Sequence, residues 1–109
     1  RLGLHHDTRL VRCTVDRATP RSKEAGLLIT NPPYGRRLAD ENIAQDIHRA
    51  LGDILRQRFL GWTAGILTEH ALVGSIGLKP ARRIPLMNGP IDCRLVVLEI
   101  STQAPKRHL

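Results

Sequence analysis

The chain has 109 residues, with 17 Lys and Arg against 10 Asp and Glu, so its formal net charge is +7. This length allows one domain at most, in which roughly two-thirds of the unfolded surface can be buried. The 41% hydrophobic and 25% charged residues exclude a disordered or collagen-like chain. No apolar run approaches the ~18 residues of a membrane span, so no membrane partner is expected. The 3% aromatic content argues against an open platform for single-stranded nucleic acid.

The first half of the chain predicts two strands and a helix. Leu10–Val15 has alternating apolar residues, which is typical of a strand. Gly26–Thr30 is a continuous apolar run that ends at two prolines, which predicts a parallel strand buried on both faces. Asp40 can cap a helix that ends at Gly61. The predicted apolar face of this helix comprises Ile43, Ile47, Ala50, Leu51, Ile54, Leu55 and Phe59.

The second half predicts a buried strand, a short helix and a hairpin. Trp62–Thr68 is the second buried strand, and Glu69–Ile76 is a short helical stretch. Ile84–Met87 and Cys93–Ile100 flank Asn88–Gly89, the commonest dipeptide of a tight hairpin turn. The latter strand is rich enough in Leu and Val to lie inside the sheet. This order predicts an α/β fold with a mostly parallel sheet and an antiparallel C-terminal hairpin.

The cysteines and histidines do not have the spacing of metal ligands. Cys13 and Cys93 are 80 positions apart and form no CxxC motif, so they are interpreted as ordinary buried thiols of a cytoplasmic protein. Apart from one adjacent pair, the histidines are scattered, and no metal site is predicted. They are His5, His6, His48, His70 and His108.

The excess positive charge is spread over several segments of the chain. A dispersed basic surface suits a polyanionic partner such as RNA, and solubility alone is an equally good explanation of the charge. The residues concerned are Arg36, Arg37, Arg49, Arg56, Arg58, Lys79, Arg82, Arg83 and Arg94.

The segment Asn31-Pro32-Pro33-Tyr34-Gly35 follows the predicted strand 26–30, at the sheet edge where α/β proteins bind ligands. The prolines stiffen the loop and hold Asn31 and Pro32 extended. The Asn31 side-chain carbonyl and a loop carbonyl can accept both protons of an exocyclic amino group and so orient its lone pair. Tyr34 can stack on a flipped-out base, and Gly35 allows close backbone approach. The alternative is a proline-rich turn with a stray aromatic residue.

The run GLLITNPPYGRRL resembles motif IV of the class I amino-methyltransferases, which use S-adenosylmethionine. More narrowly, it resembles the guanine-N2 methyltransferases of large-subunit ribosomal RNA. The resemblance continues in order through LGDILRQRFLGW, ILT, GLKPARRIPLMNG and IDCRLVVLEI, and covers roughly residues 26–101. It implies the C-terminal half of a Rossmann-like methyltransferase domain, with S-adenosylmethionine as cofactor and ribosomal RNA as partner.

The resemblance also implies catalytic and cofactor-binding roles for individual residues. Asn31 and the Pro32 carbonyl would hold the guanine amino group, Pro33 would keep the loop rigid, and Tyr34 would stack on the base. Asn31 would also lie against the cofactor. Asp16 would contact the cofactor's adenine, although no motif places it there and an exposed turn residue is the alternative.

Four residues are expected on the substrate side, namely Tyr34, Gly35, Arg36 and Arg37. The family usually has Glu where this chain has Arg36. That change would alter a local ion pair or add a phosphate contact, and a solvated side chain explains it equally well.

One feature of such enzymes has no counterpart in this sequence, namely the glycine-rich turn that cradles the cofactor. Gly3, Gly74 and Gly77 are isolated glycines. Residues 1–109 are therefore expected to be a partial catalytic domain that depends on the remainder of a parent polypeptide, with a flexible tail over 103–109. Two further hypotheses are an adenine-N6 or protein-glutamine methyltransferase and a non-catalytic RNA-binding remnant.

Overall fold

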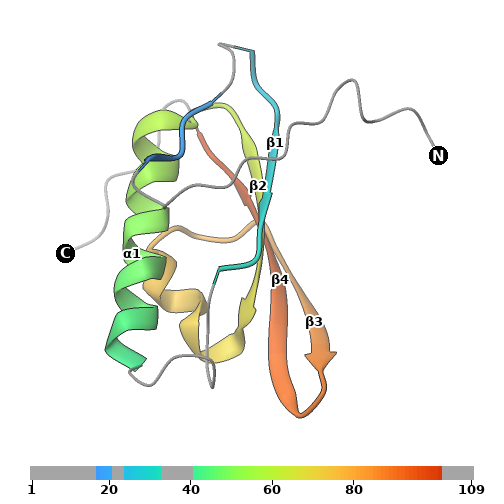
Figure 1. The fold of residues 1–109 in the computed structure, drawn as a ribbon. Helices are drawn as coiled ribbons and strands as arrows, with labels where there is room; N and C mark the ends of the chain where they lie inside the picture. Colours follow the sequence, from blue (N-terminus) through green and yellow to red (C-terminus); the bar gives the residue numbers. More distant parts are fainter. Residues whose placement is uncertain (1–16, 21–23, 33–40, 102–109) are drawn as a thin grey trace.

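The computed structural model describes residues 17–20, 24–32 and 41–101, which form a four-stranded sheet with helices against one face (Figure 1). The predicted strand 10–15 and the tail 103–109 lie outside the described residues. The elements are β1 (Leu27–Thr30), α1 (Glu41–Arg58), β2 (Thr63–Glu69), the 3-10 helix η4 (His70–Ile76), β3 (Arg82–Asn88) and β4 (Ile91–Glu99).

The strand order is β1-β2-β4-β3, so the last strand of the chain lies inside the sheet, as predicted. β1 and β2 are parallel, whereas β4 runs antiparallel to both β2 and β3. Glu69, the last residue of β2, pairs with Cys93 near the start of β4. The β3–β4 turn therefore lies at the same end of the sheet as the carboxyl ends of β1 and β2. The predicted α/β fold with an antiparallel C-terminal hairpin is confirmed.

The hairpin turn is one residue later than predicted. Asn88 pairs with Ile91, so the two turn residues are Gly89 and Pro90 rather than Asn88 and Gly89. Gly89 has a φ of 60°, a left-handed conformation that glycine adopts without steric cost.

The core lies between α1 and the face of the sheet formed by β2 and β4. Leu51, Ile54, Leu55 and Phe59 of the predicted helix face are buried, as expected from their spacing. They pack with Ala64, Ile66, Val96 and Leu98 of the sheet and with Val73, Ile76 and Ile100. At the start of the helix the prediction is wrong, because Ile43 is 49% exposed while Ala44 and His48 are buried.

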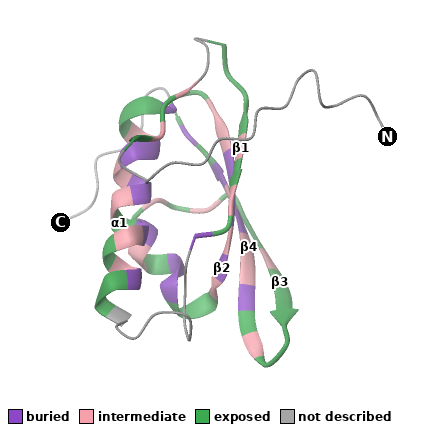
Figure 2. Ribbon diagram, in the orientation of Figure 1, coloured by how far each residue is buried: buried purple, intermediate pink, exposed green. Residues whose placement is uncertain are grey.

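The opposite face of the sheet is open in the described part of the chain. On β1, Leu27 is 61% exposed and Ile29 is 72% exposed, so the prediction that this strand is buried on both faces is wrong here. Figure 2 shows β1 largely exposed while α1 turns its buried residues toward the sheet. The physical reason is that the described helices, α1 and η4, cover only one face.

Close contacts join the two helices to each other and connect the end of α1 to the sheet. A Cβ atom at Gly52 would lie 1.8 Å from the Ile76 carbonyl oxygen, so α1 and η4 can approach this closely only with glycine at that position. Just after the end of α1, the rings of Phe59 and Trp62 meet edge to face with centroids 5.3 Å apart. The Gly61 amide donates to the Ile100 carbonyl and ties the end of the helix to β4.

We expect Gly52→Ala to loosen the packing of α1 on η4, at a cost of about 1–3 kcal/mol in stability. The new methyl group would collide with backbone, which cannot move without displacing a helix. Hydrogen–deuterium exchange of peptides from α1, measured in the complete gene product, should be faster in this variant. Gly74→Ala is the matched control, since nothing lies within 4 Å of its Cβ position. Equal exchange rates in the two variants would contradict this packing.

Candidate functional site

The candidate site begins where β1 ends. Asn31 and Pro32 follow Thr30 directly, and Asn31 is exposed while Pro32 is buried. An exposed asparagine followed by a buried, conformationally restricted proline places a polar residue on a stiff backbone. The other predicted site residues lie outside the described residues, namely Asp16, Pro33, Tyr34, Gly35, Arg36 and Arg37.

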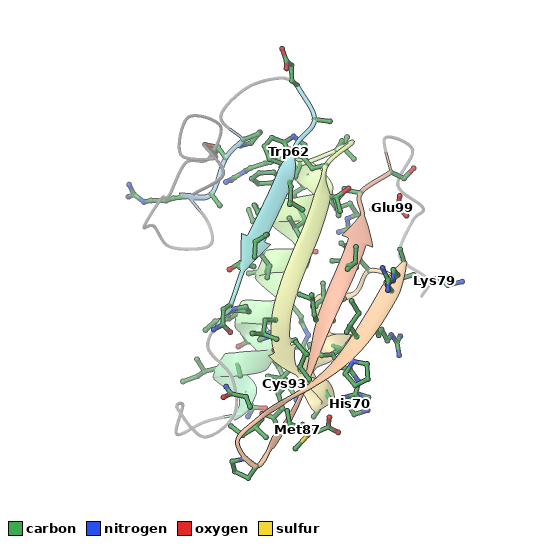
Figure 3. The ribbon with its side chains drawn as sticks, turned by 90° about the vertical axis from the view of Figure 1, so that its right-hand side faces the viewer. Trp62, His70, Lys79, Met87, Cys93 and Glu99 are labelled. Atoms are coloured by element: carbon green, nitrogen blue, oxygen red, sulfur yellow. The ribbon has the colours of Figure 1, made fainter. Side chains whose placement is uncertain are left out.

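The strand register defines what lies beside Asn31. Thr30 pairs with Ile66, so Asn31 is level with Leu67 of the neighbouring strand. Leu67 pairs with Leu95, which in turn pairs with Ile84 of β3. The candidate site is therefore the carboxyl end of the β1–β2 pair, the location at which α/β sheets bind ligands. Figure 3 shows Met87 and Cys93 at the end of the sheet toward which β2 runs.

A buried polar pair lies on the helix side of the sheet near this end. His48 and Thr68 are both 0% exposed. The His48 Nδ1 lies 2.7 Å from the Ala44 carbonyl oxygen, and Nε2 lies 2.6 Å from the Thr68 hydroxyl oxygen. Because a carbonyl can only accept, Nδ1–H is the donor. Burial favours the neutral imidazole, in which Nε2 accepts the Thr68 hydroxyl proton. The imidazole is thus neutral and fully hydrogen-bonded.

Sequence reasoning missed this pair. The sequence signal for the burial of His48 was its spacing. His48 lies four residues after Ala44 and three before Leu51, so the three residues share one face of α1, and all of them are buried. Burial lowers the pKa of His48, and the hydrogen bond with the Ala44 backbone partly opposes that effect. The neutral form is therefore the one that the fold stabilises.

The lowered pKa makes stability depend on pH. Above about pH 6.5 His48 is neutral in both the folded and the unfolded chain, and its contribution to stability is complete. As the pH falls below that value, the unfolded chain binds a proton that the folded chain does not, so stability decreases. Urea unfolding of the complete gene product between pH 8 and 5 should show this decrease. His48→Gln should flatten it, whereas His70→Gln, which keeps the buried imidazole, should not.

The described residues contain no group of three or more His, Cys, Asp or Glu side chains arranged to hold a metal ion. Within the same residues, no helix is both long and apolar enough to span a membrane. Cys93 is buried and has a free thiol. Of the two residues expected to contact a cofactor, Asn31 is described, and its exposed amide fits that role because it can both donate and accept hydrogen bonds.

Comparison with protein families gives a match to the RMKL-like methyltransferase domain, UPF0020, over residues 3–97. A protein of Allochromatium vinosum named ribosomal RNA large subunit methyltransferase K/L is 44% identical over 91 residues. That alignment covers 82% of this chain and 12% of the relative. The protein of the same name from Syntrophotalea carbinolica is 37% identical over 105 residues, which are 93% of this chain and 15% of the relative.

Solved structures show the same fold. SMU.472, assigned as a methyltransferase and crystallised in complex with SAH, superposes with a TM-score of 0.72 at 26% identity. The match covers 90% of this chain and 26% of SMU.472. A Listeria monocytogenes protein described as a predicted N6-adenine-specific DNA methylase gives a TM-score of 0.60 at 25% identity. The match covers 77% of this chain and 21% of the Listeria protein.

Proposed function

The chain belongs to the RMKL-like methyltransferase domain family, and on this premise we propose that it is part of an rRNA methyltransferase. The methyl group would pass from S-adenosylmethionine to the exocyclic N2 amino group of a guanine in large-subunit rRNA. One observation carries the proposal: an exposed Asn31 and a buried Pro32 directly follow the parallel strand β1. The chain in which they stand is 44% identical over 91 residues to a protein named as a large-subunit rRNA methyltransferase.

The proposed chemistry rests on orientation of a weak nucleophile. The Asn31 side-chain carbonyl and the Pro32 carbonyl accept the two N–H groups of the base and hold its nitrogen in place. The two prolines keep these acceptors rigid, so little entropy is lost on binding. Tyr34 stacks on the flipped base. When bound, S-adenosylmethionine supplies the electrophilic methyl group.

We also propose that the cradle for the cofactor lies in a part of the parent polypeptide beyond these 109 residues. The chain spans 12% and 15% of the two rRNA methyltransferases that it matches. The open face of β1, with Leu27 and Ile29 exposed, supports this proposal, because parallel sheets are normally covered on both faces. The proposed location of such an enzyme is the cytoplasm, where ribosomal RNA is its partner.

The test is to identify the methylated product. The complete gene product is incubated with methyl-labelled S-adenosylmethionine and unmodified large-subunit rRNA, and the RNA is digested to nucleosides. Labelled N2-methylguanosine is the expected product, and residues 1–109 alone should transfer no label. Absence of label in RNA would refute the assigned activity, and transfer by residues 1–109 alone would refute the need for further chain.

N6-methyladenosine is the second candidate product. The structural similarity to a protein described as an N6-adenine-specific DNA methylase favours it over a methylated glutamine side chain. An adenine amino group offers the same two N–H donors to Asn31 and Pro32, so the site would remain and only the base would change. A labelled protein in place of labelled RNA would indicate glutamine as the acceptor.

Replacement of Asn31 should affect turnover far more than RNA binding. We expect Asn31→Ala in the complete gene product to lower kcat by about 100-fold, because the amino group loses one of its two acceptors. RNA affinity, measured by fluorescence anisotropy, should change less than about threefold, since backbone contacts dominate affinity. Asn31→Asp keeps an acceptor oxygen and should lose less activity. Equal losses in kcat and in affinity would contradict this role.

A further inference from the structure

β3 is the outermost strand on the side of the sheet opposite β1. All its residues except Ile84 are exposed, so the strand presents almost its whole length to solvent. Its outer edge has no partner strand among the described residues. Figure 1 shows the β3–β4 hairpin extending beyond the end of β2.

Three cations lie on or next to this strand without ion-pair partners in the described part of the chain. Lys79, Arg82 and Arg83 are exposed, and residues 79–90 contain no Asp or Glu. The ion pairs found between described residues involve other arginines, namely Arg49 with Asp46, Arg56 with Asp53 and Arg94 with Asp92. The start of β3 and the residues just before it therefore carry three cations that form no ion pair within the described residues.

The far end of β3 is apolar instead. Leu86 is 43% exposed and Met87 is 67% exposed. A strand that carries cations at one end and exposed apolar side chains at the other suits a nucleic-acid strand, which offers both phosphates and base surfaces. Aliphatic side chains such as Leu and Met are among those that contact unstacked bases directly.

The register places Asn31 between these two groups. Asn31 is level with Ile84, so Arg82 and Arg83 lie before it along β3, and Leu86 and Met87 lie after it. Three interstrand spacings, about 14 Å, separate β1 from β3. About four stacked nucleotides span that distance.

We propose that Lys79, Arg82, Arg83, Leu86 and Met87, here called the β3 surface, bind the RNA strand that flanks the target base. The cations contact phosphates, and the two apolar side chains contact neighbouring bases. This inference rests on the proposed function, because it takes Asn31 as the position of the reacting base. Arginines and Pro85 on an edge strand also prevent edge-to-edge association, and the experiment separates that role from RNA binding.

The experiment measures how RNA binding depends on salt. The complete gene product is titrated into a fluorescein-labelled, single-stranded 20-nucleotide RNA of mixed sequence at several KCl concentrations. The slope of log K against log salt is negative, and each single-strand phosphate contact contributes about −0.7 to it. For Arg82→Gln/Arg83→Gln, the slope should therefore become less steep by about 1.4. Leu86→Ser/Met87→Ser should weaken binding several-fold and leave the slope unchanged.

Arg49→Gln/Arg56→Gln is the matched control, because it removes two positive charges from α1 instead of β3. Its slope should equal that of the wild type. Equal slope changes in the two double variants would show that only net charge matters and would overturn the proposal. A β3 variant that self-associates in sedimentation but binds RNA like the wild type would show an edge-protecting role and would also overturn it.

The binding experiment is independent of methyl transfer. Suppose that the wild type transfers no methyl group to rRNA, but RNA binding by the Arg82→Gln/Arg83→Gln variant depends less on salt. The proposed function then fails and RNA binding by the β3 surface stands. If rRNA is methylated and the β3 variants match the wild type in both binding and KM for RNA, the β3 surface is refuted and the proposed function stands.

Discussion

Burial of one sheet face beneath α1 is the constraint on which the other features of this structure depend. Leu51, Ile54 and Leu55 of α1 pack against β2 and β4, and α1 can also meet η4 only because Gly52 has no side chain. At about 25 cal/mol per Å² of apolar surface, such burial is the main favourable contribution available to a domain of this size. The described helices are thereby committed to one face, and the opposite face of β1, with Leu27 and Ile29, is open in the described part of the chain.

The position of β4 determines at which end of the sheet the hairpin turn lies. Because β4 is inserted antiparallel between β2 and β3, the hairpin turn lies at the same end of the sheet as Asn31. The β3–β4 hairpin, which is remote in sequence from the asparagine, thus extends from the same end of the sheet, on the opposite side from β1. The cations at the start of β3 and the apolar side chains at its far end lie on either side of the level of Asn31, an arrangement that is compatible with an RNA strand.

The His48–Thr68 pair shows how a polar contact can be accommodated in this core. Both side chains are fully buried, and both imidazole nitrogens are satisfied. Among the described residues, no buried side-chain nitrogen or oxygen atom lacks a hydrogen-bond partner. The pair joins α1 to β2 close to the candidate site. It therefore helps to fix the position of β2, the strand next to Asn31, relative to the helix.

Local sequence determined the element types, the interior position of β4 and the position of Asn31 and Pro32 directly after a strand. These depend on periodicity, on proline geometry and on residues close together in the chain. Tertiary structure alone decided which residues are buried at the start of α1, where Ala44 and His48 are buried and Ile43, predicted to be buried, is exposed. It also decided the exposure of β1 and the arrangement of β3 around the level of Asn31. These features depend on contacts and pairings between residues far apart in sequence, which spacing along one segment does not encode.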